Sequence, residues 1–253
     1  MSSYTSTQRT AIAQFTSATS TSTRVATSYL RSNGWSIERA VAAYYDAGSG
    51  SLTPQKRDSK ALTELFDKYK DLEDPTSIGL DGTINYIQDL GVDLEDPVVL
   101  ALAYKLSAPT VGQFSKQGFI NGWQEMGADT ITKMKKVVET LRDQMQNDPV
   151  FFKNVYRFTF IFVRSPGQRI LNLDSAVEYW TLLLEDRFPD KRSFDQWVSF
   201  VTEQYKKAIP RDTWNMLLDF VVNVLNNANG LDSYDSEAAW PSIFDEFVAY
   251  LKR

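Results

Sequence analysis

The most constraining feature of this sequence is a helical pattern of apolar residues that runs almost without a break from Asp58 onward. Apolar side chains recur at intervals of three and four residues, which places them on one face of an α-helix. Only two short strand-like stretches, at 77–80 and 108–111, interrupt the pattern. The sequence therefore predicts an all-α fold. The expected helical stripes are 62–69, 84–90, 98–106, 114–126, 131–145, 150–162, 176–184, 194–205 and two further helices within 209–251.

The first 47 residues differ from the rest, because they are rich in Ser, Thr and Ala. Three short helical segments are predicted at 7–15, 22–31 and 36–46, with enough apolar residues for a small three-helix core. The Gly- and Ser-rich segment that follows is typical of a flexible linker. We therefore divide the chain into a three-helix domain at 1–47, a linker at 48–56 and a larger helical domain at 57–253.

Charge and hydrophobicity exclude several classes of partner. The net charge of −5 argues against nucleic-acid binding, which needs a basic surface. No apolar run approaches the ~20 residues that cross a bilayer, and the start Met-Ser-Ser-Tyr is neither a signal peptide nor a myristoylation site. We therefore expect no nucleic-acid partner and no membrane association, and a location in the cytoplasm and nucleus.

The chain contains no Cys and no His. Without Cys it has no disulfide, no thiolate metal site and no nucleophile that could form a thioester. Without His it lacks the usual general base and the commonest metal ligand. No phosphate-binding Gly-rich loop or nucleophile-elbow motif is present instead. We therefore expect no catalytic residue, no metal site and no cofactor in this chain.

One acidic loop has the layout of a calcium site. Residues 71–82 lie between two helical segments, with Ile78 at the eighth loop position, as in an EF-hand. However, Pro75 and Gly82 occupy the fifth and twelfth positions, where oxygen ligands are needed, and Thr76 replaces the usual sixth-position Gly. We therefore expect this loop not to bind calcium.

The C-terminal stretch 209–250 combines two amphipathic helices with many acidic residues. Pro210 and Pro241 suit helix starts, and the Asn-rich segment 226–230 suits the end of the first helix. Seven acidic residues and no Lys or Arg occur from Asp212 to Leu251. The helix dipole alone favours Asp212, but an acidic surface on two helices also fits a basic protein partner. The apolar faces are Trp214, Leu217, Leu218, Val221, Val222 and Leu225, and then Trp240, Ile243, Phe244, Phe247, Val248 and Leu251.

The sequence of this stretch contains RDTWN-x-LLDF followed by SYDSEAAWPSIFDEFV, and it resembles the defective-in-cullin-neddylation family. The segments IGLDG, VVLALAYKL, RFTFIF and AVEYWTLLL extend the resemblance over 57–253, the region of the potentiating-neddylation domain. It implies helix pairs of the EF-hand type that lack calcium. It also implies an acidic patch that binds the cullin C-terminal domain, at Asp212, Ala239 and Asp245.

The same resemblance implies a hydrophobic pocket for the acetylated N-terminal Met of the neddylation conjugating enzyme. Periodicity alone would assign the matching residues to the core, so their role in a pocket rests on the resemblance. The matching positions are Leu80, Thr83, Tyr86, Val99, Leu102, Ala103, Leu106, Phe162, Tyr179 and Leu182.

The N-terminal run SYLRSNGWSIERAVAAYY resembles a ubiquitin-associated (UBA) domain. Such domains bind ubiquitin through the loop after the first helix and a face of the third. The corresponding residues are Thr16, Ser17, Ala18 and Tyr44. Because this loop lacks the apolar triplet common in the family, we expect weak binding of ubiquitin or of the neddylation modifier.

Two functions follow from these observations. The first is a monomeric scaffold-type ligase component for cullin neddylation, which holds the conjugating enzyme beside the cullin and acts by positioning alone. The alternative is a non-catalytic ubiquitin-binding adaptor or EF-hand-like interaction module, in which the acidic surface serves another partner.

Overall fold

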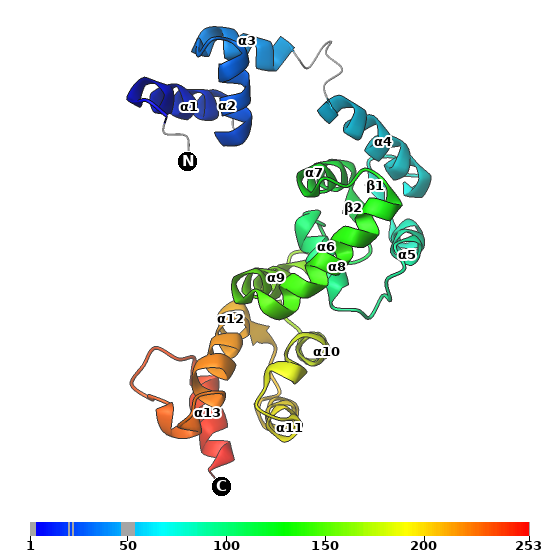
Figure 1. The fold of residues 1–253 in the computed structure, drawn as a ribbon. Coiled ribbons are helices and arrows are strands. Elements are labelled where there is room, and N and C mark those ends of the chain that lie inside the picture. Colours follow the sequence, from blue (N-terminus) through cyan, green and yellow to red (C-terminus); the bar gives the residue numbers. More distant parts are fainter. Residues whose placement is uncertain (1–3, 20, 22, 47–53, 253) are drawn as a thin grey trace. The chain divides into compact units, whose positions relative to one another are not determined.

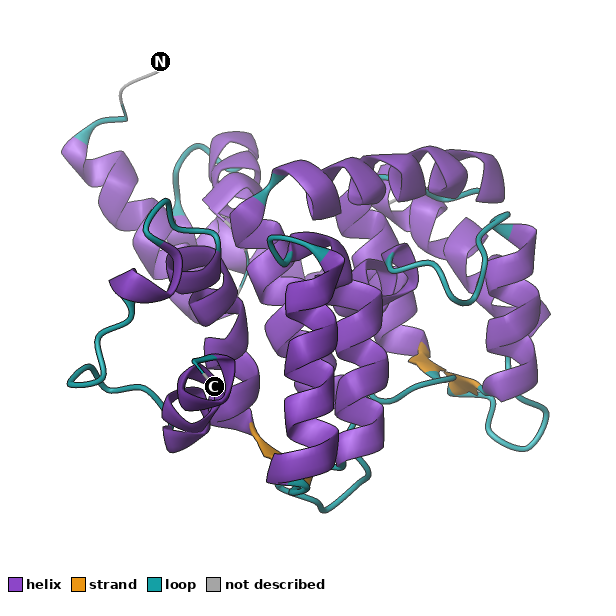
Figure 2. Ribbon diagram, turned by 90° about the horizontal axis from the view of Figure 1, so that it is seen from below, coloured by secondary structure: helices purple, strands orange, loops and turns teal. Residues whose placement is uncertain are grey.

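The computed structural model describes residues 4–19, 21, 23–46 and 54–252 (Figure 1). The chain forms two compact units, 1–57 and 58–253, each with its own hydrophobic core. Within the described residues, strands are limited to two-residue pieces among many helices (Figure 2). The predicted all-α fold is therefore confirmed. None of the helices described is both long enough and apolar enough to span a membrane.

The first unit is a three-helix bundle of α1, α2 and α3. Its core is centred on Phe15, whose ring centroid lies 6.0 Å from that of Tyr29 and 5.8 Å from that of Tyr44. The rings of Tyr29 and Tyr44 also meet edge to face at 5.4 Å. The three aromatic side chains thus join all three helices. Their bounds are Ser6–Thr19 for α1, Thr23–Ser32 for α2 and Ile37–Asp46 for α3.

The predicted linker is described only at its C-terminal end. Helix α4 (Pro54–Tyr69) begins at Pro54, so the last three residues of the predicted linker belong to a helix. Proline suits the first position of a helix because the N–H that it lacks has no helical partner there. Residues 48–53 lie outside the described part of the chain.

The second unit begins with a pair of helix–strand–helix motifs. Strands β1 and β2 pair antiparallel, with Ser77 opposite Ser115 and Ile78 opposite Phe114. This is the arrangement of an EF-hand pair. The strand-like stretch expected at 108–111 contains only an isolated bridge, from Thr110 to Gln113 across a turn at Gly112, whose φ is +73°. The strand itself lies further on, at β2. The motifs comprise α4, β1 (Ser77–Ile78) and α5 (Leu80–Asp89), then α6 (Val98–Lys105), β2 (Phe114–Ser115) and α7 (Lys116–Met126).

A second pair follows after two long helices, α8 (Ile131–Asn147) and α9 (Pro149–Phe162). Strands β3 and β4 pair antiparallel, with Ile170 opposite Pro210. The elements of this pair and of the C-terminus are β3 (Ile170–Leu171), α10 (Leu173–Leu184), η1 (Glu185–Arg187), α11 (Lys191–Ser199), η2 (Phe200–Tyr205), β4 (Ile209–Pro210), α12 (Arg211–Phe220), η3 (Val221–Leu225), η4 (Gly230–Ser233) and α13 (Ser242–Leu251).

Buried aromatic side chains fix α9 against α12. The rings of Tyr156 and Trp214 stack with their centroids 4.8 Å apart. The ring of Trp180 also stacks with that of Trp214, at a centroid distance of 5.6 Å. The Tyr156 hydroxyl donates to the Trp214 carbonyl at 2.7 Å, and the Trp214 indole donates to the Tyr156 carbonyl at 2.9 Å. All three side chains are fully buried. This reciprocal bonding sets the position of α12, which carries the first candidate residue.

Candidate functional site

Helix α12 presents two acidic side chains with different environments. Asp212 is exposed at the second position of the helix, after the N-cap residue Pro210 and Arg211, and it forms no salt bridge within the described residues. Asp219, two turns further on, is half-buried and bonded to Lys153 of α9. The charge of Asp219 is therefore compensated within the protein, whereas the Asp212 carboxylate is available to a partner.

The side chain of Phe220 organises the loop and helix that follow. Its ring lies 5.8 Å from that of Tyr234, 5.7 Å from that of Trp240 and 4.8 Å from that of Phe244. These contacts anchor the two ends of the loop before α13, and α13 itself, to α12, whereas the backbone between those ends swings outward (Figure 1). Ala239, which comes directly before Trp240, is consequently fixed although it is exposed.

Asp245 is exposed in the first turn of α13. The Tyr234 hydroxyl donates to one of its carboxylate oxygens at 2.7 Å. Burial and this neighbouring carboxylate raise the pKa of Tyr234, which keeps the hydroxyl protonated as a donor. The structure thus places Asp212, Ala239 and Asp245 at the surface of α12, α13 and the intervening loop, with Asp245 held by a hydrogen bond.

One residue of the predicted apolar face of α12 points outward. Val222 is 54% exposed, and it lies at the edge of the apolar face, about 80° around the helix from Trp214. The chain changes at Val221 to a π-helix, in which the Asn226 N–H bonds the carbonyl five residues back. Val222 therefore lies outside the buried part of this face, at the start of the wider turn. The remaining members of this face, Trp214, Leu217, Leu218, Val221 and Leu225, are buried or half-buried.

An apolar pocket of 270 Å³ lies at the first helix pair. Its walls come from α5, α6, the loop before β2, the end of α9, and α10. Three apolar side chains at its rim are exposed: Leu80 at 63%, Leu94 at 47% and Val111 at 53%. Of the ten residues predicted from the resemblance, it is lined by Leu80, Thr83, Val99, Ala103, Phe162, Tyr179 and Leu182.

The other three predicted residues do not line this pocket. Tyr86, Leu102 and Leu106 are at most 1% exposed and belong to the hydrophobic core. Tyr86 instead packs against Phe114 and Phe119, with ring centroids 6.0 and 5.3 Å away. Each helix of this pair has one apolar face toward the core and another toward the pocket. The spacing of apolar residues in the sequence does not show which residues belong to which face.

Several lining residues were not predicted. Leu94, Val111 and Gly112 come from loops, where no periodic pattern marks them. Gly112 is required on two grounds, because its φ is +73° and a Cβ there would lie 2.8 Å from Leu80 Cδ1. The remaining unpredicted residues are Ile84, Ile87, Asp96, Leu100, Gln113 and Phe114.

Two polar side chains bear on how the pocket receives a ligand. The Thr83 hydroxyl donates to the Gly112 carbonyl at 3.1 Å and so fixes the loop wall. Burial raises the pKa of Tyr179, so its hydroxyl stays neutral and can donate or accept one hydrogen bond. An apolar side chain with a neighbouring neutral amide therefore fits this pocket better than a charged group does.

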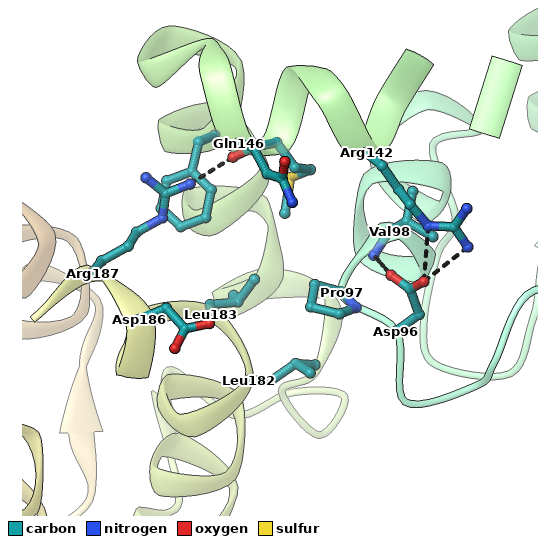
Figure 3. A pocket seen from close by; sticks show the side chains of 11 residues that line it. Asp96, Pro97, Val98, Arg142, Gln146, Leu182, Leu183, Asp186 and Arg187 are labelled. Carbon is teal, nitrogen blue, oxygen red and sulfur yellow. Dashed lines mark hydrogen bonds and ion pairs between the residues drawn. The ribbon is translucent and has the colours of Figure 1, made fainter. Parts of the chain in front are cut away.

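A second hollow of 590 Å³ adjoins the apolar pocket, and Asp96 and Leu182 line both. Figure 3 shows that its charged groups are largely bonded to the protein itself. Arg142 donates to Asp96 at 2.9 Å, and Arg187 donates to the Met145 carbonyl at 2.5 Å. This hollow lacks the continuous apolar lining of its neighbour, which makes the smaller pocket the better candidate for an apolar group.

The acidic side chains of the EF-hand-like loop accept hydrogen bonds from other residues of the same loop. Asp71 accepts hydrogen bonds from the backbone of Glu73 and Asp74, at 2.7 and 3.3 Å. Asp74 accepts from the Thr76 hydroxyl at 2.6 Å and from the Ser77 hydroxyl at 2.8 Å. Within the described residues, no group of three acidic side chains is arranged to hold a metal ion. These bonds stabilise the loop in the way that calcium does in a metal-binding EF-hand.

We expect Asp74→Asn to lower the melting temperature of the protein, because the amide loses charge-assisted bonds to Thr76 and Ser77. Those bonds hold the pKa of Asp74 below its ordinary value of 3.8. The stabilisation is therefore present at neutral pH and is lost as the pH falls below about 4 through the folded-state pKa. Thermal unfolding of both proteins at pH 7 and pH 3 tests this. Millimolar calcium should leave both melting temperatures unchanged, and a rise with calcium would contradict our interpretation of the loop.

The predicted ubiquitin-binding loop is helical in the structure. Thr16, Ser17 and Ala18 lie in the last turns of α1, where the Thr16 hydroxyl bonds the Ile12 carbonyl at 2.7 Å. The sequence has no Gly or Pro at this point to end the helix. Tyr44 packs in the aromatic core of the bundle. Among the described residues, every large apolar side chain that is exposed belongs to the second unit.

These features define a helical protein of two parts, a UBA-like bundle followed by a domain with an acidic surface and an apolar pocket. A family model described as a UBA-like domain matches residues 9–51, and one described as cullin binding matches residues 133–250. The second match contains Asp212, Ala239 and Asp245.

The chain is 40% identical over 218 residues to defective in cullin neddylation protein 1 of Yarrowia lipolytica, with 86% of each chain covered. It is 30% identical to the protein of that name from Saccharomyces cerevisiae, over 96% of this chain and 93% of the relative. It is also 37% identical to DCN1-like protein 3 of Drosophila melanogaster, over 76% of this chain and 56% of the relative. The chain belongs to the defective-in-cullin-neddylation family.

Proposed function

We propose that this protein is a scaffold-type ligase component for cullin neddylation. It binds the cullin C-terminal domain through Asp212, Ala239 and Asp245, and it binds the acetylated N-terminal Met of the neddylation conjugating enzyme in the apolar pocket. The modifier then passes from the conjugating enzyme to a cullin lysine. Membership of the family and the cullin-binding match support a role in cullin neddylation.

The observation that carries this proposal is the presence of two dissimilar surfaces on one compact unit. The pocket includes Phe162 at the end of α9, and the acidic surface begins at Asp212 on α12. The stacked and hydrogen-bonded side chains of Tyr156 and Trp214 join these two helices. A unit built in this way can hold two proteins in a fixed relation, which raises the effective concentration of the reacting groups.

The sequence inventory fits such a role. A chain with no Cys cannot carry the modifier as a thioester, and a chain with no His lacks the residue best suited to deprotonate a lysine near neutral pH. The rate increase would come from binding the charged conjugating enzyme and the cullin together. The reacting thioester and lysine would then both be supplied by the partners.

The direct test is a pull-down with cullin C-terminal fragments, followed by a transfer assay with charged conjugating enzyme. We expect the purified protein to bind the fragment and to accelerate modification, and we expect no modifier thioester on the protein itself. Failure to retain any cullin fragment would instead favour the ubiquitin-binding adaptor or the plain interaction module.

We expect a peptide from the conjugating enzyme's N-terminus to bind more tightly when its terminal Met is acetylated. A free amine carries its charge toward the apolar pocket and loses hydration, whereas the acetylated nitrogen is neutral and can hydrogen-bond through its amide. Isothermal titration of both peptides should show at least a tenfold difference in Kd. Leu80→Arg at the rim should remove binding of the acetylated peptide. Leu72→Arg, at a residue that is 97% exposed and outside the pocket, is the matched control. Equal affinity for the two peptides would exclude this pocket assignment.

A further inference from the structure

An exposed turn joins α9 to β3. The Gln168 N–H donates to the Ser165 carbonyl at 3.1 Å, with Pro166 and Gly167 between them. Gly167 has a φ of +80°, so the turn is of type II, in which proline suits the second position and glycine the third. Every residue from Ser165 to Ile170 is exposed. The Ser165 hydroxyl therefore lies at the surface, directly before a proline.

The surroundings of this turn are basic. The segment 163–172 holds Arg164 and Arg169 and no acidic residue. Because Ile170 pairs with Pro210 in the β3–β4 ladder, Arg169 and Arg211 adjoin the same end of that ladder. In the described part of the chain, no salt bridge involves any of these three arginines, and the buried Nε of Arg164 has no hydrogen-bond partner. The Arg164 guanidinium lies 5.9 Å from the centroid of the Phe160 ring, but no carboxylate of the described residues pairs with it. The turn thus combines a surface serine with guanidinium groups that have no acidic partner there, and guanidinium groups bind phosphate well.

We propose that Ser165 is phosphorylated by a proline-directed protein kinase and that Arg164 and Arg169 hold the phosphate. The Ser165 Oγ attacks the γ-phosphorus of ATP and forms a new P–O bond. The bond from the γ-phosphorus to the β,γ-bridging oxygen breaks, ADP leaves, and the hydroxyl proton passes to the base of the kinase. A phosphate at this position carries nearly two negative charges and can accept several charge-assisted hydrogen bonds.

The modification changes the charge beside the acidic surface. Arg211, at the basic end of the ladder, directly precedes Asp212 in α12. Phosphorylation of Ser165 offsets the arginines there and adds negative charge, and both changes favour a basic partner. This step rests on the proposed function. We expect the phosphorylated protein to bind the cullin C-terminal fragment about three- to tenfold more tightly at 0.1 M salt, where screening limits the effect to nearby charges.

The site is tested with the full chain, a purified cyclin-dependent kinase and ATP. Thr53-Pro54 is the only other Ser-Pro or Thr-Pro pair in the sequence, so all proteins carry Thr53→Ala. We expect nearly one phosphate per chain, mapped to Ser165 by mass spectrometry. Ser165→Ala should remove it, and Pro166→Ala should reduce its rate at least tenfold. Incorporation below one tenth per chain, or an undiminished rate with Pro166→Ala, would overturn the site.

The arginine contacts and the effect on cullin binding are tested separately. Phosphorylation should raise the melting temperature of the Thr53→Ala protein and should not raise that of the same protein with Arg164→Ala and Arg169→Ala. An equal rise in both would overturn the phosphate contacts. An unchanged Kd for the cullin fragment after full phosphorylation would overturn the regulatory step. Retention of cullin binding by Asp212→Lys would instead count against the proposed function, and the phosphate measurements do not depend on that result.

Discussion

Asp212→Lys is expected to abolish binding of the cullin C-terminal domain while the helical content of the protein stays unchanged. The side chain is exposed and forms no internal salt bridge in the described residues, so its replacement costs only the modest stabilisation that a first-turn acidic residue receives from the helix dipole. A basic partner would meet a positive charge where it now meets a negative one. Charge reversal at the centre of a docking surface commonly costs more than about 2 kcal/mol, which corresponds to at least a thirtyfold rise in Kd.

The matched control for this substitution is Asp81→Lys. Asp81 is also exposed and also lies in the first turn of its helix, α5, so both substitutions place a positive charge at a helix N-terminus. The two proteins should therefore lose similar stability, and only the Asp212 variant should lose cullin. Ala239→Arg should reproduce the loss by steric and charge conflict. Wild-type affinity in the Asp212 variant, measured by titration at 0.1 M salt, would show that the patch is assigned wrongly.

A mixture of two defective proteins is expected to remain inactive in neddylation. One protein carries Asp212→Lys and binds only the conjugating enzyme, and the other carries Leu80→Arg and binds only the cullin. In a tethering mechanism neither molecule can bring the two partners together. The rate of transfer from the charged conjugating enzyme to cullin should thus stay at the level without the protein, whereas the wild type should raise it by orders of magnitude under subsaturating conditions.

The controls for the mixture address its assumptions. Each variant should retain the binding activity that it is designed to keep, and sedimentation should show that both are monomers, because a mixed dimer could reunite the two sites. A mixture of Asp81→Lys and Leu72→Arg should be fully active. Full activity of the defective pair as monomers would exclude simultaneous tethering.

The helices were the part of this structure that the sequence predicted best. Ten of the expected stripes correspond to helices because apolar spacing reports directly which residues face the core. The predictions were wrong where apolar spacing alone does not determine the burial of a residue or the end of a helix. Val222 lies at the edge of its apolar face and is exposed, and α1 continues through Thr16 because nothing in the sequence stops it. Neither effect has a periodic signature.

The site was predicted less completely than the fold, for a physical reason. Val99 and Ala103 lie one turn apart on α6 and both line the pocket, as their spacing suggests. Leu94 and Val111 reach the same pocket from loops, whose path depends on tertiary packing. Tyr86 has the same apolar character as its neighbours but faces the core. The spacing of apolar residues identifies the apolar faces of a helix. Which of these faces packs into the core and which lines a pocket depends on how the helices pack together.

In the proposed function, helix α9 helps to set how far apart the two bound proteins are held. Phe162, at the C-terminal end of α9, lines the pocket. Tyr156, near the middle of α9, stacks on Trp214 of α12, the helix that carries Asp212. The helix therefore keeps the two sites at a fixed separation, because its internal hydrogen bonds allow little change in its length. Inserting four residues between Tyr156 and Phe162 would lengthen this separation by about 6 Å and rotate one end of the helix against the other by about 40°. If the proposed function holds, the number of residues between these two aromatic side chains helps to set the distance between the bound conjugating enzyme and the bound cullin.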